Sequence, residues 1–388
     1  MKIIRFCVYI AIVAGVLMLA VNAAMTSKSY MDIHTSLKTR IENNFSSLPY
    51  DSYFKQSYYG YLRATNRGHF NGVTFLTDGR LMLDTLENRP FLYERADAIV
   101  ELRNYLHDEG IPFLYVRVPN KIRDNTVLPV AFSDNNIIAN ADFLLNMLDE
   151  YGVDTIDLRD EMIKDDIDFT SAFYQGDHHW TADTALWGFG KIAAFVNREY
   201  GFQIDEMTWD PGQYERVVFE RAFLGEEATA VHRLRCYEDI AALNPRFHTD
   251  LIATDNDPHR YRYVDAFGSF AEVFVPKLVN EYDGVFGYGD LNALFWSFMR
   301  YENIAASERK SVLLIVDSMG IALSPYFATA FESVDDLYLV HGQNHRLWSA
   351  INYYDYDLVV YVLSDIVISN ENVPTFEHDR LFLGHPPG

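Results

Sequence analysis

The sequence has very little cysteine and a shortage of positive charge. Only Cys7 and Cys236 occur among 388 residues, and Cys7 lies in an N-terminal apolar run. We therefore expect no intramolecular disulfide, and no zinc-type cysteine spacing is present. The sequence has 32 Lys and Arg residues against 55 Asp and Glu residues, which gives a formal net charge of -23. This balance argues against nucleic acid or an anionic membrane surface as a partner. The chain also has no internal repeat or low-complexity segment.

Apolar and aromatic residues, in contrast, are plentiful. The chain is 49% hydrophobic and 15% aromatic. Such a composition provides a large core and excludes an intrinsically disordered protein. A chain of 388 residues can form two or three domains, or one large α/β domain with insertions.

The N-terminal segment predicts a membrane anchor. Residues 6–24 carry no charge, and Lys2 and Arg5 precede them. The run approaches the ~20 residues that a transmembrane helix needs, and it exceeds the roughly 7–15 apolar residues of a signal peptide. A small-residue site at Val21-Asn22-Ala23 leaves cleavage and secretion open. We favour an uncleaved single-pass anchor over residues 1–25, with the rest of the chain outside the cytoplasm.

The remaining chain predicts a stalk (26–65), one main domain (66–370) with an insertion or β-rich excursion at about 201–300, and a C-terminal tail (371–388). Phe70–Leu83 is typical of a hairpin that turns at Asp78-Gly79. Helical and strand patterns then alternate, with glycine between them. The expected helices are 91–108 and 138–151, and the expected strands are 111–119, 153–158, 312–316, 336–341 and 356–364. This alternation predicts a mostly parallel sheet with helices on its faces.

The stretch GDHHWTADTA, residues 176–185, carries the strongest chemical signal. Thr181 is typical of a helix N-cap, so the residues before it lie on a turn. Asp177 and His179 are two apart and can share one side of an extended turn. A carboxylate in that position fixes the tautomer of the imidazole and leaves its other nitrogen free as a general base.

Three interpretations of this cluster remain open. Asp177, His178 and His179 are residue types that bind divalent cations, but manganese-dependent DHH phosphoesterases also need an early D-x-D-type motif, and residues 26–113 contain none. The imidazoles can instead cap helix and loop carbonyls. The third interpretation is a Ser-His-Asp triad with a distant serine. We predict no metal and no cofactor.

Ser318 is the serine that suits such a triad. It follows the buried strand 312–316, and the carboxyl ends of parallel strands are where ligands bind in open α/β sheets. Backbone N–H groups at the start of the next helix can then hold an oxyanion. The alternative is that Ser318 only caps that helix.

Two further residues are candidates for binding. Lys121 follows a strand end and places a charge near the site, unless it is an ordinary solvated lysine. Trp180 forms a wall for sugar stacking, unless it is buried and braces the turn.

The motif resembles the D-x-H-W-[ST]-x-x-G-A signature of the AlgX/AlgJ-like SGNH hydrolase family and its DHHW branch. Other blocks agree in order: the Phe70–Leu83 hairpin, VPNK at Val118–Lys121, FLGEEATAVHR and EDIAALNPRF in the middle region, and LLIVDSMGIALSPYFA around the serine. The resemblance covers nearly everything from Phe70 to Ser364.

This resemblance implies an α/β fold, a three-layer flavodoxin-type sandwich with the motif order of a circularly permuted SGNH hydrolase. It makes Ser318 the nucleophile, His179 its base and Asp177 the residue that orients His179. The implied activity is O-acetyl transfer to a cell-surface or secreted polysaccharide, with a multi-pass membrane protein as acyl donor. A carbohydrate acetylesterase with the same triad is the alternative, and a non-catalytic carbohydrate-binding or assembly protein on this scaffold is another.

Overall fold

The computed structural model describes residues 57–62, 65, 68–83, 90–129, 136–231, 237–255, 264–276, 286–291, 298–338 and 344–370. The chain forms two compact units, 1–66 with 232–234 and 67–231 with 235–388. In the first unit, the described residues are the helix 57–62 and residue 65. The expected anchor (1–25), most of the stalk (26–65) and the tail (371–388) lie outside the described residues. Among those that are described, no helix is long and apolar enough to cross a membrane.

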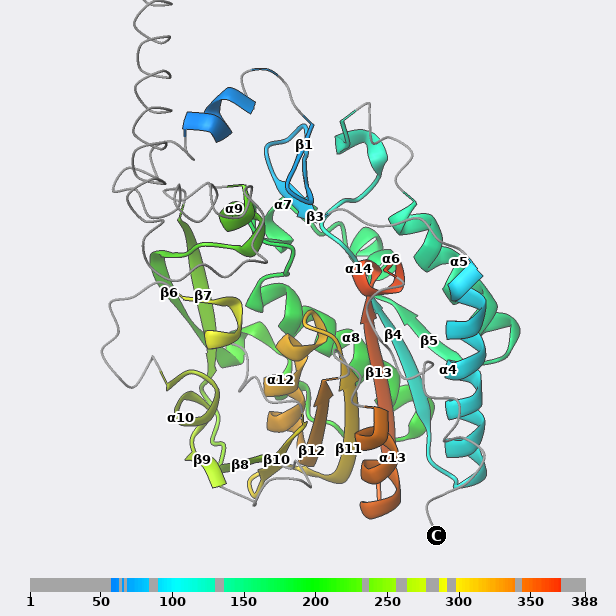
Figure 1. The fold of residues 1–388 in the computed structure, drawn as a ribbon. Helices are drawn as coiled ribbons and strands as arrows, with labels where there is room; N and C mark the ends of the chain where they lie inside the picture. Colours follow the sequence, from blue (N-terminus) through cyan, green and yellow to red (C-terminus); the bar gives the residue numbers. More distant parts are fainter. Residues whose placement is uncertain are drawn as a thin grey trace, which may run out of the picture. The chain divides into compact units, whose positions relative to one another are not determined.

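An eight-stranded sheet forms the centre of the second unit (Figure 1). Five neighbouring strands run parallel, as the sequence predicts, and three further strands continue the sheet in antiparallel pairs. The parallel strands are, in spatial order, β5 (Asp154–Asp157), β4 (Phe113–Val118), β13 (Leu358–Ser364), β11 (Glu308–Val316) and β12 (Phe331–Tyr338). The antiparallel strands are β10 (Phe298–Asn303), β8 (Leu251–Asp255) and β9 (Val264–Gly268).

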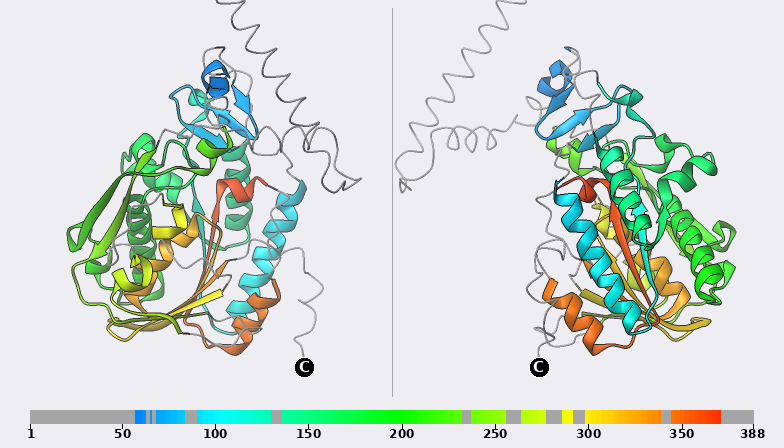
Figure 2. Two further views of the ribbon diagram at one scale, coloured as in Figure 1. Left: turned by 60° about the vertical axis from the view of Figure 1, so that its left-hand side comes forward. Right: turned by 90° about the vertical axis from the view of Figure 1, so that its right-hand side faces the viewer.

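Helices cover both faces of the sheet (Figure 2). Alternate residues of β11 point to opposite sides, so Leu313 and Ile315 belong to one hydrophobic cluster and Val312, Leu314 and Val316 to the other. The first cluster includes α4 (Pro90–Asp108), α5 (Ile137–Glu150) and α13 (Asn344–Tyr353). The second includes α6 (Leu158–Lys164), α8 (Ala182–Tyr200) and α12 (Ser324–Ala330). Three layers therefore enclose two cores.

Smaller elements surround these layers. The predicted hairpin is present, with β1 (His69–Phe70), β2 (Val73–Phe75) and β3 (Leu81–Leu83). Its turn uses Gly79 at a φ of 94°, a left-handed conformation that suits glycine. The other elements are α7 (Phe169–Ala172), β6 (Tyr214–Phe223) paired with β7 (Glu238–Pro245), α9 (Glu226–Ala230), α10 (Phe270–Phe274), the 3₁₀ turns η5 (Tyr288–Leu291) and η6 (Gly320–Leu323), and α14 (Asp365–Ile368).

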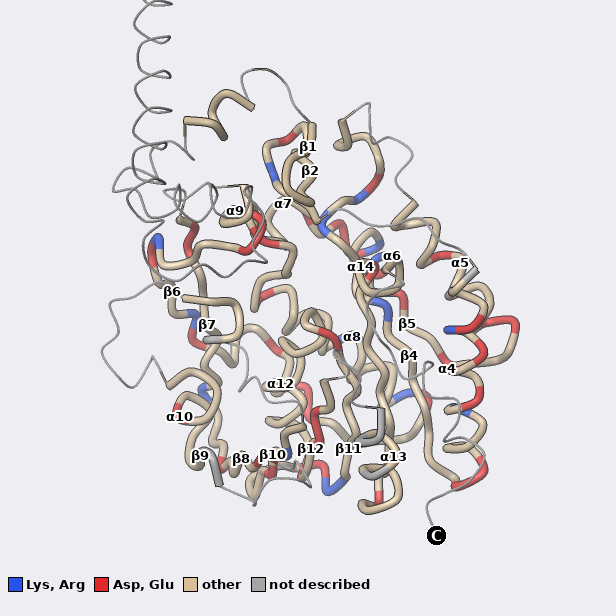
Figure 3. The backbone as a smooth tube through the Cα atoms, in the orientation of Figure 1, with Lys and Arg blue, Asp and Glu red and all other residues tan. Residues whose placement is uncertain are grey.

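One strand begins earlier than its sequence indicates. A strand was expected at 336–341, but β12 starts at Phe331. Two adjacent acidic residues hide the pattern, because Asp335 and Asp336 are both buried and have partners inside the protein. Asp335 accepts hydrogen bonds from Arg300 and Tyr356, at 2.8 and 2.6 Å. In the described part of the chain, Asp and Glu occur along helices, strands and loops of the domain (Figure 3).

Candidate active site

The two sequence motifs meet at the carboxyl end of β11. The indole N–H of Trp180 donates a hydrogen bond of 3.0 Å to the carbonyl oxygen of Met319. The residue after His179 therefore contacts the residue after Ser318. Ser318 is partly exposed, and within the described part of the chain neither its hydroxyl nor its backbone N–H donates a hydrogen bond.

Asp317 shapes the turn that presents Ser318. One carboxylate oxygen accepts from the backbone N–H groups of Met319 and Gly320, each at 3.0 Å. The other accepts from Ser364 N, at the end of neighbouring strand β13, at 2.7 Å. Burial raises the pKa of Asp317, although these hydrogen bonds oppose the shift. The expectation that the N–H groups at this helix start hold an oxyanion needs correction, since Asp317 already occupies those of Met319 and Gly320.

The carboxylate of Asp177 contacts both the backbone N–H and the imidazole of His179. The Nδ1 of His179 lies 2.5 Å from Asp177 Oδ1, which also accepts from His179 N at 3.0 Å. The second oxygen accepts from Glu226 N at 2.8 Å. Burial would raise the pKa of Asp177, but the hydrogen bond from His179 and the two neighbouring imidazoles hold it well below its usual range. We infer that Nδ1 carries the proton, which leaves the Nε2 of His179 as an acceptor.

Two rings enclose the imidazole of His179. The ring of His178 lies 3.9 Å away between centroids, at an interplanar angle of 35°. The ring of Tyr288 stacks on it at 3.8 Å and 14°. Tyr288 belongs to η5. An aromatic residue between Gly287 and Gly289 was the one signal available, and no spacing rule links it to His179.

His178 and His179 have opposite electrostatic surroundings. The Nδ1 of His178 lies 3.2 Å from a carboxylate oxygen of Glu227, which has no exposed surface. Burial alone would lower the pKa of His178, but Glu227 raises it to about 9. Burial lowers the pKa of His179 to about 4, and the charge of His178 contributes to that shift. At neutral pH, His178 is therefore charged and His179 neutral.

Lys121 lies beneath the motif rather than in solvent. It is buried, and its Nζ donates to the carbonyl oxygens of Tyr174 (2.8 Å), Gln175 (3.4 Å) and Asp177. Burial lowers its pKa, while the carboxylates of Glu227 and Asp177 oppose that shift. Lys121 thus holds the turn from inside, and the interpretation as a solvated lysine is wrong.

Trp180 is also inside the protein, with no exposed surface. Its ring packs on α8, where a Cβ added at Gly188 would lie 3.2 Å from the indole. The structure therefore favours the second interpretation given above for Trp180: it braces the turn and presents no face on which a sugar can stack.

The cluster has the spacing of a metal site but not its charge balance. Ligand atoms of Asp177, His178 and His179 lie within 4.8 Å of one another. However, Asp177 already accepts hydrogen bonds on both oxygens. The ammonium of Lys121 and the imidazole of His178 also balance the carboxylates of Asp177 and Glu227. A divalent cation would have to displace these partners, so the cluster fits hydrogen bonding better than metal binding.

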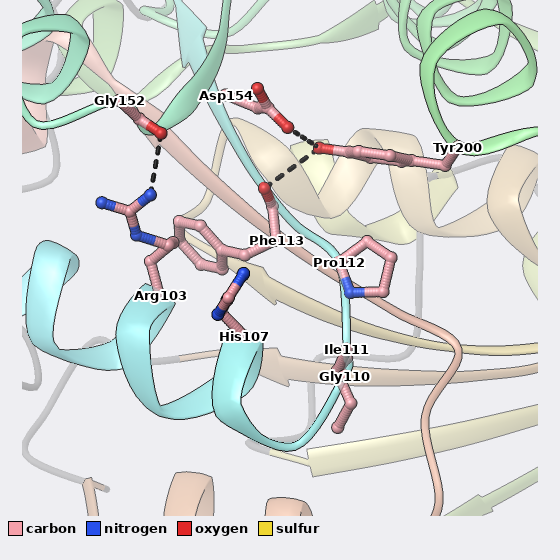
Figure 4. A pocket seen from close by; sticks show the side chains of 9 residues that line it. All are labelled: Arg103, His107, Gly110, Ile111, Pro112, Phe113, Gly152, Asp154 and Tyr200. Carbon is pink, nitrogen blue, oxygen red and sulfur yellow. Dashed lines mark hydrogen bonds between the residues drawn. The ribbon is translucent and has the colours of Figure 1, made fainter.

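One described cavity lies away from these residues. It has a volume of about 420 Å³ and is lined by Arg103, His107, Phe113, Asp154 and Tyr200, among others. Figure 4 shows the hydroxyl of Tyr200 between Asp154 and the carbonyl of Phe113. Phe113 and Asp154 begin β4 and β5, whereas Ser318 follows the end of β11. The cavity therefore lies at the amino ends of the parallel strands, and Ser318 lies at their carboxyl ends.

The mostly parallel sheet with helices on both faces is an SGNH hydrolase-like α/β fold. Residues 75–225 match the family described as "ALGX: SGNH hydrolase-like domain, acetyltransferase AlgX". This match confirms, over these residues, the family resemblance inferred from the sequence. The match includes Asp177 to Trp180 and ends before Ser318.

Solved structures show the same fold. PatB1 from Bacillus cereus, determined with and without a sulfonyl adduct, superposes with a TM-score of 0.60 at 17% identity, covering 76% of this chain and 96% of PatB1. A DHHW family protein from Eubacterium siraeum superposes with a TM-score of 0.51 at 15% identity, over 78% of this chain and 94% of its own. Among curated proteins, no significant match was found.

Proposed function

We propose that this protein is an extracytoplasmic SGNH-type acyltransferase that O-acetylates a cell-surface or secreted polysaccharide. The observation that supports the proposal is the hydrogen bond between Trp180 and Met319, because it joins the residue after His179 to the residue after Ser318. A strand-end serine next to a tautomer-fixed histidine is the arrangement of nucleophilic acyl transfer.

Ser318, His179 and Asp177 each have a separate role in the proposed reaction. The hydroxyl of Ser318 attacks the acyl donor while its proton passes to Nε2 of His179. Asp177 keeps Nδ1 protonated and stabilises the imidazolium that forms. His179 then returns the proton to the leaving group of the donor. In the second half, His179 deprotonates the acceptor hydroxyl as this attacks the acyl-serine, and it then returns that proton to the leaving Oγ of Ser318.

The oxyanion needs donors that are not already in use. Met319 and Gly320 direct their N–H groups to Asp317. The backbone N–H of Ser318 has no such partner in the described part of the chain, so we assign it as one oxyanion donor.

Two comparisons support acyl chemistry. The matched family model is described as an acetyltransferase domain. The structurally similar PatB1 was solved with a sulfonyl adduct, and sulfonyl reagents attach to activated nucleophiles. In this chain, Ser318 is the nucleophile that such a reagent would reach.

The setting of the reaction follows from the N-terminal segment. Lys2 and Arg5 before an uncharged run favour an anchor with the catalytic unit outside the cytoplasm. Anchoring keeps the enzyme at the bilayer, where a multi-pass membrane protein would deliver acyl groups. The net charge of -23 suits a neutral or cationic acceptor more than a strongly anionic one.

The test is to supply the full chain with p-nitrophenyl acetate and a panel of candidate glycans. A transferase diverts acetyl groups to glycan, detected as acetylated product by mass spectrometry. Acetate release that no glycan diverts would contradict transfer and favour the carbohydrate acetylesterase. If Ser318 is not acylated by any donor, the non-catalytic carbohydrate-binding alternative would be favoured. The Ser324→Ala variant is a matched control, since Ser324 is fully buried against Asp336.

A further inference from the structure

Glu227 is a fully buried carboxylate for which the proposed reaction has no direct use. It lies on α9, and no hydrogen bond reaches either of its oxygens within the described part of the chain. Its close ionic contact is Nδ1 of His178, at 3.2 Å. A buried carboxylate is costly unless it is paired with a positive charge, and His178 provides that charge here. This pairing gives Glu227 a role beyond packing.

The contacts of α9 lead directly to the catalytic imidazole. Glu227 contacts His178, whose ring lies 3.9 Å from that of His179. The same helix also binds the turn itself, since Glu226 N donates to Asp177 and Ala228 N to Gly176 O, at 2.8 and 2.9 Å. Thus α9 contacts both Asp177 and His178, the two residues that flank the imidazole of His179.

Close packing fixes α9 in this position. A Cβ at Gly225 would collide with Gly176 O and with the Cβ of Asp177. Only a glycine at the start of α9 lets the helix approach so closely. The position of the Glu227 carboxylate relative to His178 is therefore set by backbone contacts as well as by its own side chain.

We propose that Glu227 is a positioning residue for the base: it holds His178 against one face of the His179 ring, opposite Tyr288. This proposal rests on the proposed acyl-transfer function. Glu227 touches no reacting atom and acts through His178. It keeps a positively charged ring next to His179, so that His179 stays neutral and oriented while it waits for the proton of Ser318.

The charges around both rings agree with this role. His178 faces the carboxylates of Glu227, Asp177 and Glu226, which raise its pKa against burial. His179 faces Asp177, which raises its pKa, whereas burial, His178 and Lys121 lower it. Removal of the Glu227 charge lets His178 lose its proton near neutral pH. The pKa of His179 then rises, because a neighbouring positive charge has gone.

The kinetic experiment uses Glu227→Gln in the full chain, with Glu226→Gln as the matched control on the same helix. We measure kcat/KM for p-nitrophenyl acetate from pH 3.5 to 9. For Glu227→Gln, we expect the acid-limb midpoint to rise by about one pH unit, with most activity retained at pH 8. Glu226→Gln, whose side chain is further from the rings, should shift it far less. A uniform loss at every pH without a moved midpoint would overturn the proposal.

Coupling to His178 gives a second criterion. His178→Gln should shift the midpoint in the same direction, and the Glu227→Gln/His178→Gln double variant should shift it no further than the larger single change. Additive shifts would mean that Glu227 acts by another route. If Glu227→Gln fails to fold, His178→Gln still decides the matter, since an unmoved midpoint there contradicts the proposal.

A readout without catalysis separates this inference from the proposed function. We follow the histidine ring signals of the full chain by ¹³C NMR against pH, assigning His178 and His179 by their loss in the His178→Gln and His179→Gln variants. In the unmodified protein, His178 should titrate near pH 9, and in Glu227→Gln it should titrate below pH 7. An unchanged titration of His178 would overturn the positioning role even if catalysis is confirmed. If the unmodified protein shows no Ser318-dependent activity, the proposed function fails while the NMR result still stands.

Discussion

The indole N–H of Trp180 and the carbonyl oxygen of Met319 are 3.0 Å apart. These two residues come from stretches separated by almost 140 positions in the chain. Each directly follows a residue that the proposed reaction needs, His179 in one case and Ser318 in the other. Because the indole is fully buried, its bond ties the two halves of the site together inside the core.

Replacing Trp180 by Phe tests this link. The change keeps an aromatic ring but leaves the Met319 carbonyl without its donor, which costs about 1–3 kcal/mol when a polar group stays buried. We expect a lower Tm and a loss of kcat/KM that exceeds the effect on KM. Trp187→Phe is the control, since that indole bonds to the exposed Asp165 on the protein surface. Equal behaviour of the two variants would contradict the link.

The two histidines should respond differently to removal. His179→Ala takes away the base, so kcat/KM should fall by about 10³-fold or more. His178→Ala should retain a large fraction of activity at pH 8, because a neutral His179 remains bound to Asp177. The comparison is made by steady-state kinetics at pH 8. Similar losses at both positions, or activity that needs added manganese or zinc, would favour a metal centre instead.

The stability of the protein should depend on pH through His178 and His179. The folded pKa of His179 is lowered to about 4 from 6.5, so its contribution to stability is present above pH 6.5 and is lost as the pH falls towards 4. The folded pKa of His178 is raised to about 9, so its contribution is present below pH 6.5 and is lost as the pH rises through 9. Tm should therefore peak between these limits. A Tm that climbs steadily above pH 9 would contradict this assignment.

Lys121 should matter for folding rather than for substrate binding. Lys121→Met leaves three carbonyl oxygens under the motif without their donor and leaves Glu227 with one cation fewer. We expect destabilisation of roughly 2–4 kcal/mol, measured by urea unfolding. Lys191→Met is the control, because Lys191 forms surface ion pairs with Glu161 and Asp165. A change confined to KM at unaltered stability would instead make Lys121 a binding residue.

Local sequence patterns predicted much of this fold, because the parallel strands are nearly continuous apolar runs and glycines separate them from helices. Helix α4 and strand β4 lie within two residues of their expected bounds. β12 was placed too late in the chain, since burial of Asp335 and Asp336 depends on partners from other strands and helices. Such long-range compensation leaves no periodic signal in the strand itself.

The candidate site was only partly predictable for the same reason. The pairing of Asp177 with His179 is local, so a spacing of two residues was enough to propose it. Glu227 and Tyr288 reach the imidazoles from about 50 and 110 residues downstream, and only the folded chain brings them there. Lys121 was interpreted either as a charge near the site or as a solvated lysine, whereas its burial makes it a support of the turn. For Trp180, the structure favours the buried interpretation that the sequence already allowed.

We propose above that Ser318 is an acyl-accepting nucleophile activated by His179. The most direct measurement is mass spectrometry of peptides from the full chain after brief reaction with p-nitrophenyl acetate or phenylmethylsulfonyl fluoride. The account predicts an adduct on Ser318 in the unmodified protein, a much slower adduct in His179→Ala, and unchanged labelling in Ser324→Ala. Failure of both reagents to modify Ser318, or an adduct formed equally fast without His179, would contradict it.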